Sequence, residues 1–246
     1  MKHKLLLLTL AISSSVSFAE DYSQFQAFDN QISIGYGMKE DQVTNNNNTV
    51  NNLSDSSMVN FEGERLLNNG IWIDLNANMT FNQGEANIAN NPVISNYGFN
   101  GKVGYAFQVV NTHLLVTPYF IGGVNNNGLN IPTNNVPVNL TANEFFATAG
   151  GGGRIEYRIN NSILVYADQN AAYNKNRTSN NEIGSDDDFY SYTSTIGAKF
   201  NLVKDFQLGV KAFYTNYQPD AGVKQTGNYL QAQSSSGALV SLGLTY

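Results

Sequence analysis

Apolar and polar residues alternate along most of this chain with a period of two. In residues 71–82 the odd positions, from Ile71 to Phe81, are apolar, whereas the even positions are mostly polar and include Asp74. Residues 97–109 repeat this pattern. Such alternation predicts a strand with one apolar and one polar face. Both runs exceed the five or six residues of an average globular strand and match the ~9–11 residues with which a tilted strand crosses a bilayer.

The same pattern predicts ten strands in all. Their expected ranges are 31–38, 56–67, 71–83, 95–109, 113–124, 144–158, 162–174, 188–202, 205–217 and 233–246. The first of these is short, and Gln169 interrupts the apolar face of the seventh.

The connections between these strands alternate in length. The short ones are 68–70, 110–112, 160–161 and 202–205, and the long polar ones are 39–55, 84–94, 125–143, 175–187 and 218–232. Short turns at one end and long loops at the other are typical of outer-membrane barrels. Aromatic residues gather at both ends of the strands, as in the girdles at the two membrane interfaces. We therefore predict an all-β, transmembrane, antiparallel up-and-down barrel with periplasmic turns and extracellular loops.

Composition agrees with a barrel and excludes other classes. Charged residues make up only 13% of the 246 residues, against about 25% in ordinary soluble domains. The mean hydropathy is nevertheless −0.28, because asparagine, threonine, serine and glycine replace the missing charges. A basic nucleic-acid-binding protein and a helical membrane protein are both disfavoured. The absence of cysteine excludes disulfide scaffolds and cysteine-ligated metals.

A signal peptide is expected over residues 1–19. Lys2 and Lys4 make the first four residues positively charged, and a short apolar run follows them. Small residues then precede a cleavage site after Ala19. The apolar run is too short to span a bilayer. Cleavage would leave 11 of the 13 basic residues against 19 acidic ones, a formal charge of −8. Residues 20–246 are then expected to form a single barrel domain.

Three segments resemble a known family. The chain ends in alternating apolar residues and a terminal aromatic (Val240, Leu242, Leu244 and Tyr246). This end resembles the signal by which bacterial outer-membrane barrels are recognised for insertion. Thr117–Val124, and Gly153–Arg158 followed by Leu164–Asp168, are similar to hairpins of the opacity-type and OmpA-like small barrels. The resemblance implies the outer membrane of a Gram-negative bacterium and contact with its barrel-assembly machinery. Those families have eight strands, which is the alternative to the ten expected here.

Charged residues on the polar faces are expected to point into the lumen. They are Glu62, Glu64, Asp74, Glu156 and Asp168 with Lys102, Arg154, Arg158, Lys199 and Lys211. Five acids and five bases in a narrow barrel predict a salt-bridged network, since an unpaired charge there would be costly. A selective porin would more plausibly carry an excess of one sign. A largely closed lumen is the favoured prediction, and a narrow passive porin for small polar solutes is the alternative.

Catalytic and metal-binding patterns are scarce. His3 leaves with the signal peptide, and His113 lies beside a periplasmic turn, away from the outer rim. A histidine-based hydrolase site is therefore disfavoured. Gly150–Gly153 falls inside a strand rather than before a helix, and Asp186–Asp188 lacks the spacing of a calcium loop. No catalytic residue, metal or cofactor is predicted, and an outer-membrane enzyme is the least favoured function.

The long loops carry the remaining candidate function. They contain asparagine runs at 45–48, 51–52, 90–91, 125–127 and 134–135. Such polar, nearly uncharged stretches cannot bury a core of their own. We predict a non-enzymatic surface barrel, structural or adhesin-like. Its expected partners are membrane lipid, lipopolysaccharide, the assembly machinery and a host or surface ligand at the loops, but no nucleic acid.

Overall fold

The computed structural model describes eight stretches of the chain. They are residues 22–44, 50–82, 93–109, 112–131, 140–177, 188–203, 205–219 and 231–246. The expected signal peptide lies outside the described residues, as do the central parts of the long polar segments, at 45–49, 83–92, 132–139, 178–187 and 220–230.

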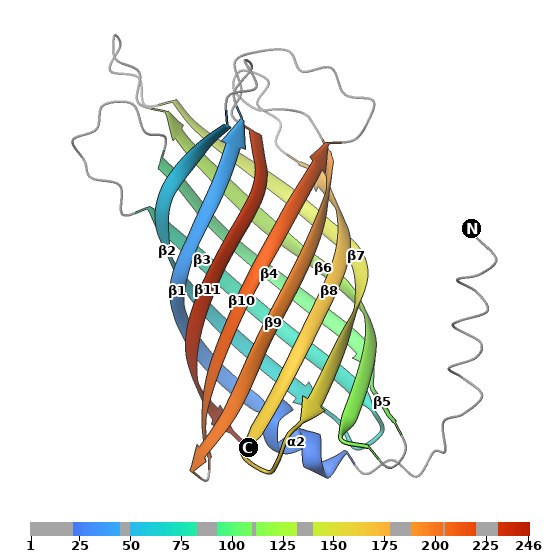
Figure 1. The fold of residues 1–246 in the computed structure, drawn as a ribbon. Helices are drawn as coiled ribbons and strands as arrows, with labels where there is room; N and C mark the ends of the chain where they lie inside the picture. Colours follow the sequence, from blue (N-terminus) through green and yellow to red (C-terminus); the bar gives the residue numbers. More distant parts are fainter. Residues whose placement is uncertain are drawn as a thin grey trace, which may run out of the picture.

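Strands make up most of the described residues (Figure 1). One helix, α2 (Ser23–Asp29), comes before them. The strands are β1 (Gln31–Thr44), β2 (Val50–Leu66), β3 (Ile71–Asn82), β4 (Val93–Tyr105), β5 (Phe107–Gln108), β6 (Leu114–Ile131), β7 (Leu140–Arg158), β8 (Ile163–Asn176), β9 (Phe189–Val203), β10 (Phe206–Pro219) and β11 (Gln231–Thr245). Within the described ranges, no helix has the length and apolar character needed to cross a membrane.

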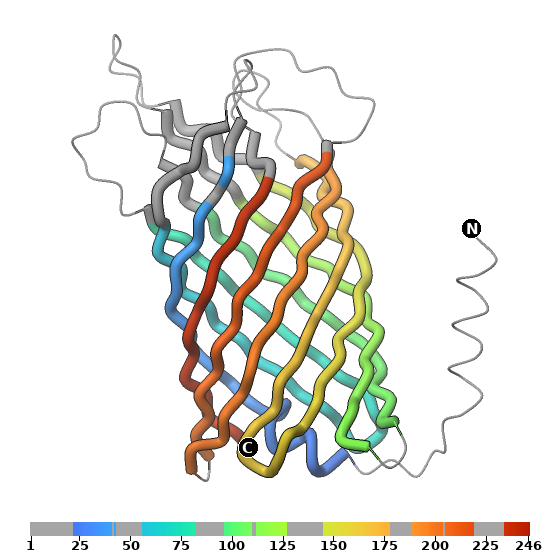
Figure 2. The backbone as a smooth tube through the Cα atoms, in the orientation of Figure 1, coloured from blue at the N-terminus to red at the C-terminus, as the bar shows by residue number. Residues whose placement is uncertain are grey.

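The strands form one closed antiparallel sheet. Each strand pairs with the next along the chain, except that β4 pairs with β6, and β1 also pairs with β11. β4 and β5 pair with the same neighbour, β6, on either side of Ala106, so together they are one strand of the wall. The wall therefore has ten strands, which share a common tilt (Figure 2). The prediction of a ten-stranded up-and-down barrel is confirmed, and the alternative of eight strands is wrong.

The two faces of the wall follow the alternation in the sequence. In β3, Leu75 and Met79 are each 47% exposed on the outside, whereas Trp72 and Asp74 are buried inside. Because side chains of a strand point alternately to its two faces, a register error of one residue would exchange these sets. Gln169 keeps its place on the outer face and is exposed there.

Several strands are longer than their apolar pattern predicts. β1 continues to Thr44, and β2 begins at Val50, so much of the expected loop 39–55 is strand. The expected loop 125–143 is likewise shortened, because β6 and β7 remain paired as far as Ile131 and Leu140. The alternation fades there because strands beyond the membrane need no apolar face, while backbone hydrogen bonding continues.

The last strand closes the barrel against the first. Leu242 of β11 lies opposite Ile34 of β1, and the backbone N–H of Tyr246 donates to Asn30 O at 3.1 Å. The outward-facing side chains of this strand include those expected to form the insertion signal, Val240, Leu242, Leu244 and Tyr246, all of which are exposed.

Candidate functional site in the barrel lumen

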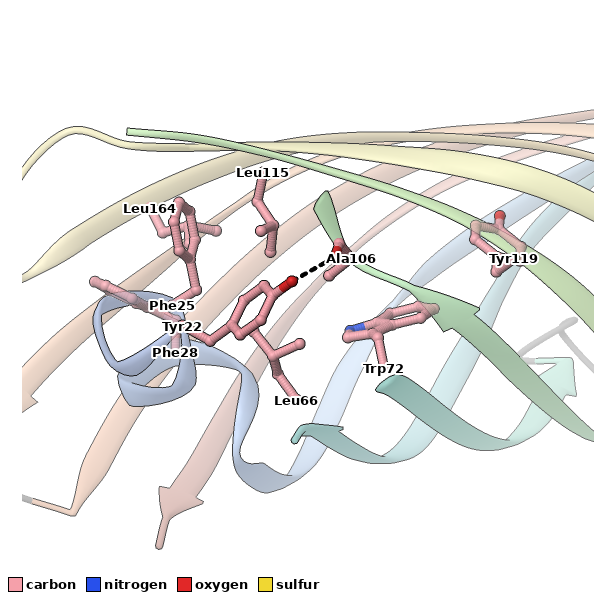
Figure 3. Close-up of a cluster of buried hydrophobic side chains, with 9 residues drawn as sticks. All are labelled: Tyr22, Phe25, Phe28, Leu66, Trp72, Ala106, Leu115, Tyr119 and Leu164. Carbon is pink, nitrogen blue, oxygen red and sulfur yellow. Dashed lines mark hydrogen bonds between the residues drawn. The ribbon is translucent and has the colours of Figure 1, made fainter. Parts of the chain in front are cut away.

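Helix α2 lies at the short-turn end of the barrel (Figures 1 and 3). Its Phe25 and Phe28 are fully buried, and the preceding Tyr22 is 4% exposed. They pack with inward-facing side chains of the wall, namely Leu66, Trp72, Ala106, Leu115, Tyr119 and Leu164. Burying a phenylalanine side chain contributes ~1.5–3 kcal/mol. An isolated seven-residue helix is unstable in water, so this packing holds α2 in place.

The start of α2 is fixed at an irregularity in the wall. The Tyr22 hydroxyl donates to Ala106 O at 2.8 Å, at the point where β4 gives way to β5. Gly70 lies in the adjoining turn, and its φ is +83°. A Cβ at this position would lie 2.7 Å from the Tyr22 hydroxyl. The turn therefore requires glycine both for its backbone conformation and for the space that Tyr22 occupies.

The end of α2 is held by polar side chains from three wall positions. Phe28 O accepts hydrogen bonds from Lys199 Nζ at 3.3 Å and Gln207 Nε2 at 3.2 Å, and Ala27 O accepts one from Asn201 Nδ2 at 3.1 Å. The last carbonyls of a helix have no partner within it, and a cation is favoured beside them. β9 and β10 thus satisfy the end of the helix and attach it to the wall.

Directly beside α2 lies a buried cluster of three carboxylates and two cations, which we call the inner charge cluster: Asp29, Glu64, Glu156, Arg154 and Lys199. Lys199 Nζ lies 2.7 Å from Asp29 Oδ1 and 2.6 Å from Glu64 Oε2. Arg154 lies 3.2 Å from Glu64 Oε1, and its Nε donates to Glu156 Oε1 at 2.6 Å. Each of the five residues is at most 5% exposed. The cluster joins the helix to β2, β7 and β9.

This cluster has one more carboxylate than it has cations. Burial, together with the nearby charge of Glu156, raises the pKa of the Asp29 carboxyl to about 7, while Lys199 and Arg154 oppose the rise. Asp29 Oδ2 and Glu156 Oε2 receive no hydrogen bond from any other described group. A proton on Asp29, donated to Glu156, balances the cluster and satisfies both oxygens.

The same carboxylates could in principle hold a metal ion, because oxygen atoms of Asp29, Glu64 and Glu156 lie within 4.8 Å of one another. Lys199 and Arg154, however, already contact these oxygens at salt-bridge distances. Two cationic side chains supply the charge that a divalent ion would supply. The arrangement therefore fits an internal salt-bridge cluster better than a metal centre.

A second group of ion pairs lies farther along the lumen. Lys102 Nζ lies 3.0 Å from Asp168 Oδ2 and 3.6 Å from Asp74 Oδ2, and Lys211 Nζ lies 2.7 Å from Glu62 Oε2. The Tyr119 hydroxyl donates to the other oxygen of Asp168 at 2.6 Å. We call these five charged residues the outer charge layer. Together, the cluster and the layer bring nine of the ten expected lumen charges into ion pairs.

Arg158 is the exception. It is 9% exposed and donates to Asn161 Oδ1 at 2.7 Å, and it forms no ion pair with any residue that the structure describes. It is the last residue of β7, two positions beyond Glu156 on the same face and beside the turn at 160–161.

Aromatic rings pack against the lumen cations. The Arg154 guanidinium lies 4.2 Å from the centre of the Tyr166 ring and 5.4 Å from that of Trp72. Lys102 Nζ lies 4.9 Å from the centre of the Tyr119 ring. Rings in such positions attract cations through their quadrupoles. They also fill part of the space between the charged side chains.

Beyond the outer charge layer, toward the long-loop end, the lumen contains a cavity of about 310 Å³. Its wall carries many amide and hydroxyl side chains, including Asn100, Asn125, Thr148, Asn174 and Ser191. Its lining also includes charged residues of the outer layer, such as Lys102 and Lys211. Arg154 of the inner charge cluster and Tyr166 also line it, so the cavity reaches past the outer charge layer to the edge of the inner charge cluster.

The other sequence features occupy structural positions. His113 lies at the short-turn end, where its Nδ1 is 3.0 Å from Arg158 O. Gly150–Gly153 lies within β7, and a Cβ at Gly152 would fall 2.6 Å from the Tyr119 hydroxyl. Asp188 accepts hydrogen bonds from the Tyr173 hydroxyl and from Asn176 N. Asp186 and Asp187 lie outside the described residues.

Sequence reasoning missed helix α2 and the part that Asp29 plays. The available signal was weak, consisting of Phe25 and Phe28 at a helical spacing of three and an acid directly after them. Two apolar residues do not distinguish a helix in the lumen from an irregular polar segment before the first strand.

The outer surface defines the class of protein. An exposed aliphatic band includes Ile34, Leu75, Val103, Ile155, Ile196 and Leu242, and exposed aromatic residues flank it at both ends, among them Tyr105, Tyr157 and Phe206 on one side and Phe81, Tyr97 and Tyr190 on the other. A closed barrel with an apolar band between aromatic girdles is suited to a bilayer. The protein is an outer-membrane β-barrel of the Gram-negative type.

Comparison with known proteins agrees on the fold. No family model matches the chain, and no curated protein does. The β domain of the Bordetella autotransporter BrkA is similar in structure, with a TM-score of 0.50 and 10% identity over 89% of this chain and all of that one. The surface protein NspA of Neisseria has a TM-score of 0.42 and 6% identity, over 87% of this chain and 97% of that one. The Escherichia coli outer-membrane protease OmpT has a TM-score of 0.45 and 8% identity, over 95% of this chain and 99% of that one. At these identities the similarity concerns the fold alone.

Proposed function

We propose that this protein is a non-enzymatic surface barrel, structural or adhesive, whose lumen is closed at the periplasmic end. The observation that carries the proposal is helix α2, whose Phe25 and Phe28 are fully buried among inward-facing residues of the wall. Behind this apolar layer lies the inner charge cluster, in which Lys199 and Arg154 link α2 to three strands.

Closure follows from the order of these layers. A hydrated ion crossing the lumen would first meet the outer charge layer, where Lys102 and Lys211 are paired with carboxylates. It would then have to separate buried ion pairs, which costs several kcal/mol when a charge is left without its partner. Finally it would meet the apolar packing around Phe25 and Phe28. No single-sign ring of charge exists in this path, within the described residues, to attract an ion.

The partners follow from the surfaces. The exposed apolar band suits membrane lipid and lipopolysaccharide, and the alternating end of β11, with Val240, Leu242, Leu244 and Tyr246, suits recognition by the barrel-assembly machinery. The long-loop end is the part of the barrel that would contact other cells or host surfaces. These partners are part of the proposal.

Solute entry into liposomes tests closure. Vesicles containing the full-length barrel should swell in small polar solutes no faster than protein-free vesicles, because α2 blocks the lumen. A variant lacking residues 22–29 should swell faster, which shows that the assay detects an open barrel. Rapid swelling with the unmodified protein would contradict the proposal.

Loop shortening tests the adhesive role. Replacing 132–139 and 178–187 with short turns leaves the paired ends of β6, β7, β8 and β9 intact. Binding of the purified barrel to cells or matrix should fall sharply, while the folded form keeps its heat-modifiable mobility on gels. Unchanged binding by the shortened barrel would refute contact through these loops.

A narrow passive porin is the second candidate. The polar cavity of about 310 Å³ in the outer half of the lumen favours it, because small solutes could enter that far. The two functions differ only at the inner end, where α2 either stays docked or leaves. Swelling by the unmodified protein would therefore select the porin.

A further inference from the structure

The lumen cavity combines aromatic rings with a belt of neutral polar side chains. Phe146, Phe189 and Tyr217 all line it, from β7, β9 and β10. The Phe146 and Phe189 ring centres are 5.0 Å apart, and those of Phe189 and Tyr217 are 5.6 Å apart, both in edge-to-face contact. Phe146 is buried, whereas Phe189 and Tyr217 are half-buried and present part of their surface.

The neutral belt is a chain of hydrogen bonds across five strands. Asn100 and Asn125 donate to each other's amide oxygens at 3.2 and 3.4 Å, and Asn125 Nδ2 also donates to Thr148 Oγ1 at 2.9 Å. The Thr148 hydroxyl donates to Asn174 Oδ1 at 2.7 Å, and Asn174 Nδ2 donates to Ser191 Oγ at 2.9 Å.

These bonds fix the amide groups without exhausting them. A carboxamide offers two N–H donors and two acceptor lone pairs. The two bonds of Asn100 within the belt use half of that capacity, and so do the two bonds of Asn174. The cavity wall is thus a rigid array of donors and acceptors of both kinds.

Charged residues of both signs line the cavity, namely Glu62, Asp74 and Asp168 with Lys39, Lys102, Arg154 and Lys211. At its floor the charges are paired with one another. Lys211 is paired with Glu62, and Lys102 lies between Asp74 and Asp168. An anionic ligand would have to displace one of these carboxylates, and a cationic ligand one of these ammonium groups. Either exchange leaves a buried charge without its partner, so the floor of the cavity disfavours charged ligands.

We propose that this cavity binds a neutral carbohydrate, one or two sugar units in size. A sugar ring has C–H faces that pack on aromatic rings and hydroxyl groups that both donate and accept hydrogen bonds. The half-buried rings of Phe189 and Tyr217 suit the former, and the amide belt suits the latter. The volume of about 310 Å³ is at the small end of the ~300–1,000 Å³ typical of small-molecule sites.

This inference rests on the closed lumen proposed above. In a closed lumen the cavity is open only toward the long-loop end, so it is a binding site and not part of a transport path. The two proposals can fail separately. Liposome swelling reports whether the lumen is closed, whereas sugar binding to the detergent-solubilised barrel reports whether the cavity is a site.

The test uses the full-length barrel in an amine-oxide detergent, because alkyl-glycoside detergents carry sugars themselves. Maltose and N,N′-diacetylchitobiose serve as neutral probes, and a sulfated disaccharide serves as the charged one. Saturation-transfer NMR and calorimetry should detect at least one neutral probe, bound more tightly than the sulfated one. Phe189→Ala should weaken that binding by about tenfold or more, which is the size of effect expected at a central contact.

Tyr214→Ala is the matched control, since Tyr214 is on β10 like Tyr217 but is 49% exposed on the outer face. It should leave binding unchanged. If Phe189→Ala fails to fold, as judged by gel mobility, Phe189→Leu keeps an apolar side chain and removes only the ring, and it should weaken binding too.

Three results would overturn the inference. They are no binding of either neutral probe, equal or tighter binding of the sulfated probe, and binding that survives both Phe189 variants. If binding survives those variants but disappears when 132–139 and 178–187 are shortened, the contact belongs to the loops. That result would overturn the cavity site and leave the adhesive role standing.

Discussion

Glu64 receives four side-chain contacts at the centre of the inner charge cluster. Lys199, Arg154 and Gln31 approach its carboxylate at 2.6, 3.2 and 3.2 Å, and the Trp72 indole N–H donates to it at 2.9 Å. The residue is 1% exposed. A single carboxylate therefore holds two buried cations and the only tryptophan of the chain.

Glu64→Gln should destabilise the barrel strongly. The amide keeps the shape of the side chain but leaves Lys199 and Arg154 short of one negative charge in a buried place, and breaking such a pair costs ~3–5 kcal/mol. Urea unfolding followed by gel mobility measures the loss. Asp205→Asn, an acid-to-amide change at an exposed turn residue, is the control and should have little effect. Equal stability of Glu64→Gln and the unmodified protein would contradict the role given to Glu64.

The raised pKa of Asp29 predicts that the free energy of unfolding decreases as the pH rises. Its pKa rises from 3.8 to about 7 on folding, so the folded state binds the proton more tightly. The stabilisation is complete below pH 3.8 and is lost as the pH rises toward 7 and beyond. Around Asp29, the charged groups are Lys199, Arg154, Glu64 and Glu156.

Asp29→Asn supplies the measurement. The free energy of unfolding of the unmodified protein, minus that of Asp29→Asn, should decrease between about pH 5 and about pH 8, because the amide cannot ionise. Urea titrations of both proteins at the two pH values give this difference. An increase with pH would mean that Asp29 is an ordinary ionised salt-bridge partner of Lys199.

Among the elements, α2 depends most on its surroundings. Phe28→Ala should cost ~3–5 kcal/mol if its site cannot collapse, and it should loosen α2 in an otherwise folded barrel. Protease cleavage near residue 22 and the unfolding free energy report these two effects. Phe206→Ala is the matched control, because Phe206 lies at the same end of the barrel but is 53% exposed on the outer face. If both variants behave alike, α2 is not held by Phe28.

The elements differ in how far the sequence predicts them. The membrane-crossing parts of the strands follow from alternation alone, as in β3, because lipid outside and polar groups inside impose opposite demands on adjacent residues. The extensions do not follow from it. Asn125–Asn127 has the composition of a loop but lies in β6, where pairing with β7 continues. Helix α2 forms only because the lumen offers it apolar contacts, and no local pattern reports that.

For the whole molecule, the period of two decides which residues face the lumen, and it places all ten expected charges there or at the edge of it. It does not decide which charges meet. Lys199 and Glu64 are 135 residues apart, and their contact depends on the diameter of the closed barrel and on the stagger of its strands. Asp29 completes their cluster from outside the strands, which is why strand patterns alone describe the site incompletely.

The low overall charge of the chain follows from the same architecture. Charge is excluded from most outward-facing positions, and those that carry it, such as Arg65 of β2 and Lys175 of β8, lie near strand ends. The lumen has room for few ionic groups. Those few are almost all paired within the described residues. The wall therefore encloses two layers of paired charges above a helix, and we propose that this stack does not conduct.

Single-channel recording in planar bilayers tests that claim most directly. The unmodified barrel should insert without steady openings, because α2 and the inner charge cluster fill the lumen. The variant lacking residues 22–29 should show steady openings under the same conditions, which demonstrates that inserted barrels are detected. Steady openings of the unmodified barrel, equal in size to those of the deletion variant, would contradict closure by α2.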